Sequence, residues 1–81
     1  MKDDTVYLRH IRDAISRLQE YTKGGRDDFL RSPQIQDAVI RNLEIIGEAV
    51  KHLSDDLRRQ HPDVPWKQIA GMRDEVIHEY F

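Results

Sequence analysis

The segment PQIQDAVIRNLEIIGEAVKHL, residues 33–53, is the longest and most apolar part of the chain with a helical pattern. Its large apolar residues recur at steps of three and four, as they do along one face of a helix. These residues are Ile35, Val39, Leu43, Ile46, Val50 and Leu53. Ser32 is a good N-cap, and Pro33 suits the first helical position because its missing N–H loses no bond there. We therefore predict a long helix over residues 33–53.

The apolar stripe of this helix is wider than one small partner helix would cover. Ile40, Ile45 and Ala49 broaden it, so we expect a second apolar contact. Gly47 lies inside the same helix, where glycine costs about 1 kcal/mol relative to alanine. The simplest compensation is the close approach of another backbone, with Gly47 and Ala49 as candidates for close packing.

A first helix is predicted over residues 6–21, with Asp4 or Thr5 as its N-cap. Its apolar residues again follow the helical period: Leu8, Ile11, Ile15 and Leu18. The KGG sequence at 23–25 ends it, because glycine readily adopts the left-handed conformation that closes helices. A single turn within residues 27–32 should then pack Phe29 and Leu30 onto the core.

The rest of the chain predicts a third helical segment. Residues 54–65 hold a polar turn and two prolines that forbid a continuous helix. Pro65 and Trp66 begin the third segment, and Gly71 bends or breaks it before Arg73. No strand-like alternation is visible. We predict an all-α fold in a single domain, residues 1–81, built from an antiparallel helix hairpin and a third helix.

Composition limits the function classes. The chain of 81 residues has 13 basic and 15 acidic residues, which does not favour a general polyanion-binding protein but leaves room for a local anion site. It contains no cysteine and hence no disulfide or cysteine-based zinc site. The N-terminal residues lack the apolar core of a signal peptide, and no run of about 18 apolar residues occurs. We expect a cytoplasmic protein with no membrane partner.

The four histidines do not form a metal-binding pattern. They are His10, His52, His61 and His78. No His-x-x-x-His spacing places two histidines on one helix face. We therefore expect no metal site and no cofactor.

The sequence RDEVIHEY, residues 73–80, carries the candidate chemistry. On one regular helix, Arg73 and His78 lie about 140° apart at 100° per residue. They can meet if Gly71 bends the helix, if the long arginine arm reaches back, or if two subunits combine their residues. Asp74 and His78, at i and i+4, could form a carboxylate–imidazole pair. The simpler interpretation is an exposed arginine, a half-buried histidine and a tyrosine that packs its ring.

Arginine and histidine together suit the cleavage of phosphate esters in RNA. The planar guanidinium of Arg73 can bind phosphate through two hydrogen bonds and offset developing charge. The imidazole of His78 can move a proton on the 2′-hydroxyl or on the leaving oxygen. Neither step requires a metal.

Three segments resemble the HepT toxin family of the HEPN ribonuclease superfamily. They are YLRHIRDAISRLQEY (7–21), IRNLEIIGEAVKHL (40–53) and HPDVPWKQIAGMRDEVIHEYF (61–81). The family signature Arg-x-x-x-x-His-x-Tyr is matched by Arg73, His78 and Tyr80. The resemblance implies a HEPN-type helical bundle, a homodimer with active-site clefts at the subunit interface, and a metal-independent endoribonuclease with Arg73 and His78 as catalytic residues.

The resemblance also implies a toxin–antitoxin system. The partner would be a minimal nucleotidyltransferase that silences the toxin by attaching AMP to Tyr80. Relatives usually continue with a further helix, so we expect that the final helix is missing here. Arg58 and Arg59 are candidates for RNA contact. The alternative function is a catalytically inactive helical module for dimerisation or partner binding, which the nearly even charge favours.

Overall fold

The computed structural model describes residues 3–80, and the side chains of residues 3–79. Within that range all regular structure is helical, as predicted. The helices are α1 (Asp4–Tyr21), α2 (Gly25–Arg31), α3 (Pro33–His52), α4 (Asp55–Gln60), α5 (Trp66–Ala70) and α6 (Met72–Tyr80).

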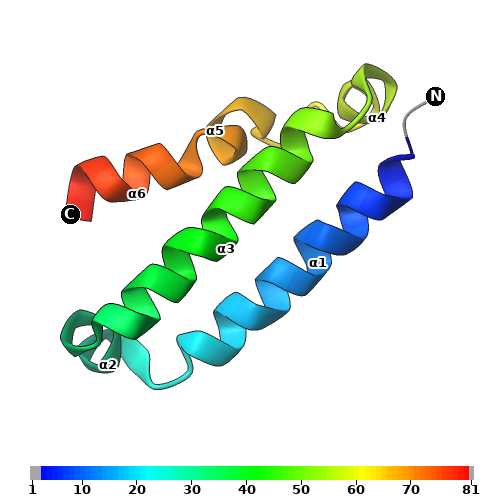
Figure 1. The fold of residues 1–81 in the computed structure, drawn as a ribbon. Helices are drawn as coiled ribbons and strands as arrows, with labels where there is room; N and C mark the ends of the chain where they lie inside the picture. The colour runs from blue at the N-terminus through cyan, green and yellow to red at the C-terminus, as the bar shows by residue number, and fades with distance from the viewer. Residues whose placement is uncertain (1–2, 81) are drawn as a thin grey trace.

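The long helix α3 is the centre of the arrangement. Helix α1 lies antiparallel beside it, and α5 and α6 run back along it in the opposite direction (Figure 1). The short helices α2 and α4 lie at opposite ends of α3 (Figure 1). The molecule is elongated, with extents of 43 × 23 × 18 Å. The predicted helix hairpin with a third helical segment is therefore the observed fold.

Helix α3 begins where the sequence predicts. The side-chain oxygen of Ser32 accepts a hydrogen bond from the backbone N–H of Ile35 at 3.2 Å, and Pro33 occupies the first turn. This bond satisfies one of the backbone donors that every helix start leaves unpaired. The helix ends at His52, one residue earlier than predicted, because Leu53 has an extended backbone.

Helix α1 is capped by a different residue from those predicted. The carboxylate of Asp3 accepts a hydrogen bond from the backbone N–H of Thr5 at 3.1 Å, so the prediction of Asp4 or Thr5 as the cap is wrong. The carboxylate of Asp4 instead accepts from the N–H of Ser54 at 2.8 Å and from its hydroxyl at 2.7 Å. Asp3 therefore caps the helix, while Asp4 joins the start of α1 to a residue 50 positions further along the chain.

Two glycines and a short helix connect α1 to α3. Gly25 has a φ of +87°, which glycine adopts without steric cost. Residues 25–31 form helix α2 rather than the predicted single turn. Phe29 is half-buried as expected, but Leu30 is 55% exposed, so its predicted place in the core is wrong. Neighbouring residues on a helix point about 100° apart, so the side of α2 that packs against α3 buries Phe29 more than Leu30.

The core lies where α1, α3 and α5 meet. Its buried residues are Ala14, Ile46, Val50 and Leu53. Trp66, Ile69 and Met72, from α5 and the start of α6, pack against this cluster. The broad apolar stripe of α3 is thus covered by α1 and by the α5–α6 segment, which confirms the expected second contact.

Candidate functional site

Gly71 separates the segment that carries the candidate residues from the helix before it. It caps α5, and its backbone N–H donates to the carbonyl of Lys67 at 3.2 Å. The predicted break at this glycine is confirmed. Because α6 begins at Met72, both Arg73 and His78 lie after the break on one helix. The bend therefore does not bring these two residues together.

Gly47 determines how closely this segment approaches α3. A Cβ built on Gly47 would lie 2.9 Å from the carbonyl oxygen of Ala70, a distance that real Cβ contacts essentially never show. The approach of another backbone to Gly47, predicted from the cost of glycine inside a helix, is thus present. Its partner is the last residue of α5.

The antiparallel packing continues from this contact to Arg73. Three residues before Gly47 on α3 is Glu44, and three residues after Ala70 is Arg73. The Nε of Arg73 lies 3.3 Å from Oε1 of Glu44, in an ion pair between the two elements. The contact at Gly47 and the ion pair at Glu44 therefore follow one another three residues apart in the sequence of both partners.

Arg73 lies at the edge of a groove between α3 and α6. The groove has a volume of about 160 Å³ and is bordered by Glu44, Glu48 and Lys51 from α3, and by Arg73 and Asp74 from α6. We call it the α3–α6 groove. The side chain of Arg73 is 45% exposed, and its Nη1 donates a hydrogen bond to Asp74 at 3.0 Å. The guanidinium is thus accessible from solvent while two carboxylates contact it.

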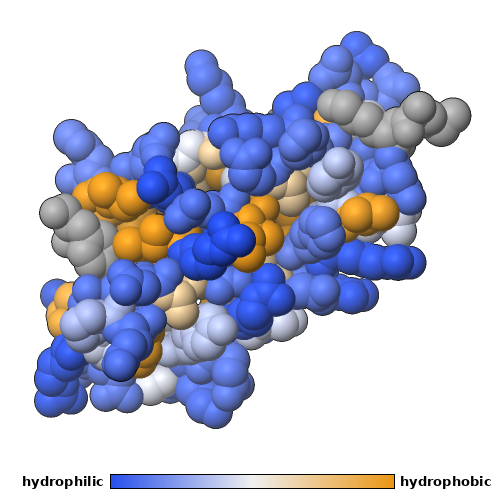
Figure 2. All heavy atoms as spheres, viewed as in Figure 1, coloured by the Kyte–Doolittle hydropathy of each residue, from blue (hydrophilic) through white to orange (hydrophobic). Residues whose placement is uncertain are grey.

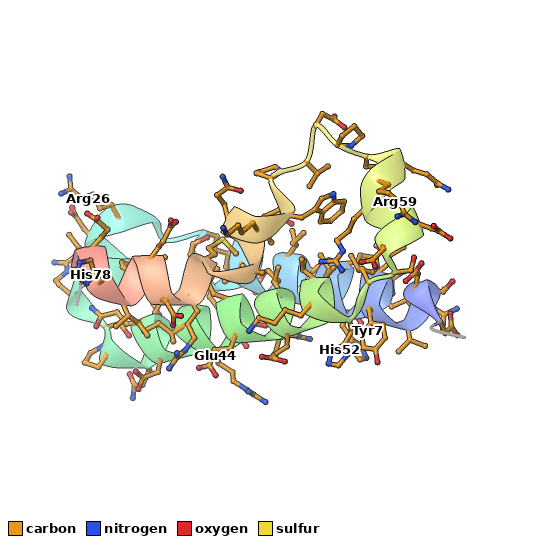
Figure 3. All side chains as sticks on the ribbon, turned by 90° about the horizontal axis from the view of Figure 1, so that it is seen from above. Tyr7, Arg26, Glu44, His52, Arg59 and His78 are labelled. Carbon is orange, nitrogen blue, oxygen red and sulfur yellow. The ribbon has the colours of Figure 1, made fainter. Side chains whose placement is uncertain are left out.

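His78 lies on a different part of the same helix. It is exposed and borders a shallow surface hollow with Asp74, Glu75 and Glu79. Figure 3 shows His78 near the end of α6, well apart from Glu44, the partner of Arg73. Since the two motif residues occupy one regular helix, their directions differ by about 140°. One copy of the chain does not bring Arg73 and His78 to a common point.

Asp74 and Tyr80 are the remaining motif positions predicted to take part. The carboxylate of Asp74 bonds to Arg73, and within residues 3–79 it makes no hydrogen bond to His78. Tyr80 is the last residue of α6, and its side chain lies outside the part of the chain that the structure describes.

Arg58 and Arg59, the candidates for RNA contact, lie on the short helix α4. They form ion pairs with Asp55 and Asp56, three residues earlier on the same helix. In Figure 3 Arg59 and His78 lie toward opposite ends of the molecule. Within one copy, an RNA strand that contacted both residues would have to follow most of the length of α3.

Two features of the structure were not predicted. The first is Glu44, whose sequence signal is its position one helical turn before Gly47 on the same helix face. The second is the ring of Tyr7 on α1, which stacks on the ring of His52 with centroids 5.0 Å apart and planes 13° apart (Figure 3). The stacking depends on how α1 and α3 are aligned along their lengths, and the sequence pattern does not predict this alignment.

The part of the chain that the structure describes contains neither a metal-binding cluster nor a membrane-spanning helix. Among residues 3–80 no group of three His, Asp or Glu side chains is placed to hold a metal ion. No helix in that part of the chain has the length and apolar character needed to cross a membrane.

Fold and site together define an all-helical domain that carries the pattern Arg-x-x-x-x-His-x-Tyr on one helix, α6. The sequence profile of the HepT-like family, described as Ribonuclease HepT-like, matches residues 11–81. The chain belongs to this HepT-like ribonuclease family.

Three relatives show how far the similarity extends. A proposed RNase of Caldanaerobacter subterraneus subsp. tengcongensis is 51% identical over all of this chain and 73% of its own length. A proposed ribonuclease HepT of Thermococcus cleftensis is 49% identical over 93% of this chain and 69% of its own. A gamma-glutamylcyclotransferase and proposed RNase of Methanocaldococcus jannaschii is 49% identical over 99% of this chain but only 36% of its own. No solved structure matches the chain.

Proposed function

We propose that the chain is a subunit of a metal-independent endoribonuclease that acts as the toxin of a toxin–antitoxin system. The observation that carries the proposal is the complete family pattern on α6, with Arg73 and His78 both exposed. Membership of the HepT-like ribonuclease family supports the same activity. RNA is the proposed substrate, and the cytoplasm is the expected place of action.

The chemistry assigned to the two residues is an internal transfer at one phosphate. His78 takes the proton from a 2′-hydroxyl, and that oxygen attacks the neighbouring phosphorus. The bond from phosphorus to the 5′-oxygen then breaks, the leaving oxygen takes a proton from water, and the imidazolium of His78 returns its proton to the solvent. Arg73 contacts the phosphate and offsets the negative charge that develops on it. The products are a cyclic 2′,3′-phosphate end and a free 5′-hydroxyl end.

We further propose that two copies of the chain form each site. Arg73 and His78 of one copy point in different directions, whereas a twofold dimer can place Arg73 beside His78 of the partner subunit. Exposed apolar side chains offer surface for such a dimer: Val6, Leu8 and Ile15 on α1 are 39–44% exposed. Figure 2 shows a further gathering of apolar atoms near the end of α6.

The other motif positions complete the proposal. A nucleotidyltransferase antitoxin transfers AMP from ATP to the hydroxyl of Tyr80 and releases pyrophosphate, which blocks the site. Oδ1 of Asp74 accepts a hydrogen bond from Arg73, and the other oxygen of this carboxylate orients His78, one turn further along α6. Arg58 and Arg59 add positive charge along the path of a longer RNA.

The direct test is RNA cleavage by the purified protein in the presence of a chelator. Wild-type protein should produce fragments with cyclic phosphate ends, and His78→Ala should produce none. His61→Ala is the matched control, because it removes another exposed histidine at the end of α4. Equal cleavage by wild type and His78→Ala, or a complete loss with chelator, would contradict the proposal.

The second candidate function is a helical module that binds a partner and performs no catalysis. The observation in its favour is that Glu44 and Asp74 both contact the guanidinium of Arg73, while Glu75 and Glu79 lie near His78. These carboxylates disfavour the approach of phosphate. Growth arrest on expression that disappears with Arg73→Ala would support the enzyme, and growth unaffected by either protein would support the module.

A further inference from the structure

Glu44 is the only α3 residue that forms an ion pair with Arg73 among the described residues. Its Oε1 lies 3.3 Å from Nε of Arg73, and the two side chains are 37% and 45% exposed. Glu44 stands in the middle of α3, next to buried Leu43 and two residues before buried Ile46. Its backbone is therefore held by the core, and its shorter side chain gives the long and flexible arginine side chain a partner on α3.

The segment that carries Arg73 is fixed on the other side. Ala70 approaches Gly47 too closely for any side chain at that position, which sets the start of α6 against α3. An arginine has about 2 kcal/mol of rotamer entropy, so the position of its backbone alone does not determine where the guanidinium lies. The ion pair with Glu44 supplies the missing restraint.

The atoms used in these contacts leave part of the guanidinium available. Arginine has five N–H donors in a planar fork. Glu44 faces Nε, and the one hydrogen bond that the group makes within residues 3–79 runs from Nη1 to Asp74. The Nη2 donors make no hydrogen bond there. A phosphate that binds at Nη2 and the second Nη1 donor therefore need not displace Glu44.

We propose that Glu44 is a positioning residue, which holds the guanidinium of Arg73 at the edge of the α3–α6 groove in the orientation that receives the RNA phosphate. The inference rests on the proposed ribonuclease function and deepens it. Glu44 does not touch the phosphate; it acts through Arg73. An exposed ion pair of this kind adds little to folding stability, so its effect must be sought in catalysis.

Glu48 provides a matched control within the same groove. It lies one turn after Glu44 on α3, is exposed, and pairs with Lys51 at 3.4 Å instead of with Arg73. Glu44→Gln and Glu48→Gln each remove one negative charge and keep the side-chain length. Any gain from reduced repulsion of RNA is shared by both variants, whereas the loss of positioning is confined to Glu44→Gln.

The experiment compares wild type, Glu44→Gln and Glu48→Gln for cleavage of the same RNA and for the NMR signal of the Arg73 Nε–H. We expect Glu44→Gln to cleave about tenfold more slowly than Glu48→Gln, since small displacements of a catalytic group are costly. The Arg73 signal should shift in Glu44→Gln and stay in place in Glu48→Gln, with thermal unfolding of both close to wild type.

The outcomes separate this inference from the proposed function. Equal cleavage and equal Arg73 signals in the two variants would overturn the positioning role, even if the wild-type protein is an active ribonuclease. If no protein cleaves RNA, the proposed function fails, and an Arg73 signal unaffected by Glu44→Gln would overturn the positioning role as well. A shift confined to Glu44→Gln would still establish that Glu44 holds Arg73.

Discussion

The carbonyl oxygen of Ala70 lies where a side chain on Gly47 would have to be, 2.9 Å from the position of its Cβ. This contact sets the distance between α3 and the segment that carries Arg73 and His78. It also explains a glycine in the middle of a long helix, a position where glycine costs about 1 kcal/mol relative to alanine.

Gly47→Ala should therefore destabilise the protein, although alanine is the better helix former. The new methyl group must push the backbone of Ala70 away, and overpacking of this kind costs about 1–3 kcal/mol. Urea unfolding at fixed protein concentration measures the effect. Gly71→Ala is the control, because its Cβ would meet only the carbonyl of Lys67 at an ordinary 3.7 Å. Equal stability of the two variants would show that the Gly47 contact is not tight in solution.

The contact between Asp4 and Ser54 should hold the start of α1 against the junction of α3 and α4. Asp4→Ala removes two hydrogen bonds to Ser54, each charge-assisted, and we expect a loss of about 1–3 kcal/mol. The backbone amide of Ser54 should also exchange its hydrogen faster. Asp13→Ala removes an exposed carboxylate from the same helix and should leave both measurements nearly unchanged. No change in Ser54 exchange in Asp4→Ala would contradict the contact.

Substitution of two leucines outside α6, Leu53 and Leu30, should affect the free energy of unfolding to very different extents. Leu53 is fully buried in the core, so Leu53→Ala should cost about 2–5 kcal/mol. Leu30 is 55% exposed, and Leu30→Ala should change the free energy of unfolding by less than about 1 kcal/mol. Urea titrations of both variants measure the difference. A large loss at Leu30 would show that α2 is covered by another molecule in solution.

Modification and catalysis should be separable at Tyr80. If the antitoxin attaches AMP to this hydroxyl, Tyr80→Phe should remain toxic when the nucleotidyltransferase is expressed beside it, whereas the wild-type toxin is neutralised. Mass spectrometry of the co-expressed proteins should show an added AMP only on the wild type. An AMP group on Tyr80→Phe would place the modification elsewhere.

Local sequence signals predicted much of the fold. Ser32 and Pro33 mark the start of α3, and Gly71 marks the break before α6, because caps and breaks depend on nearby backbone groups. The close approach to Gly47 followed from the cost of glycine inside a helix. The partner of that approach, Ala70, did not follow, since it depends on how two distant segments are aligned.

The wrong cap of α1 and the missed role of Glu44 both depend on contacts between segments that are distant in the sequence. Asp4 or Thr5 was predicted to cap α1, but Asp3 is the cap, and the carboxylate of Asp4 bonds instead to a residue 50 positions away. Glu44 was missed because its role appears only when α6 is placed against α3. For the motif itself, helix periodicity indicated correctly that Arg73 and His78 diverge on one helix, and the structure shows that the break at Gly71 does not alter this.

The central claim is that Arg73 of one subunit and His78 of the partner subunit act on the same phosphate. Its most direct test is the activity of mixed dimers, obtained by co-expressing Arg73→Ala and His78→Ala chains with different tags and purifying through both tags. Each variant alone should be inactive. The mixed dimer should regain about half of wild-type cleavage, since one of its two sites then has both residues intact. A mixed dimer as inactive as the Arg73→Ala and His78→Ala proteins alone would contradict the claim.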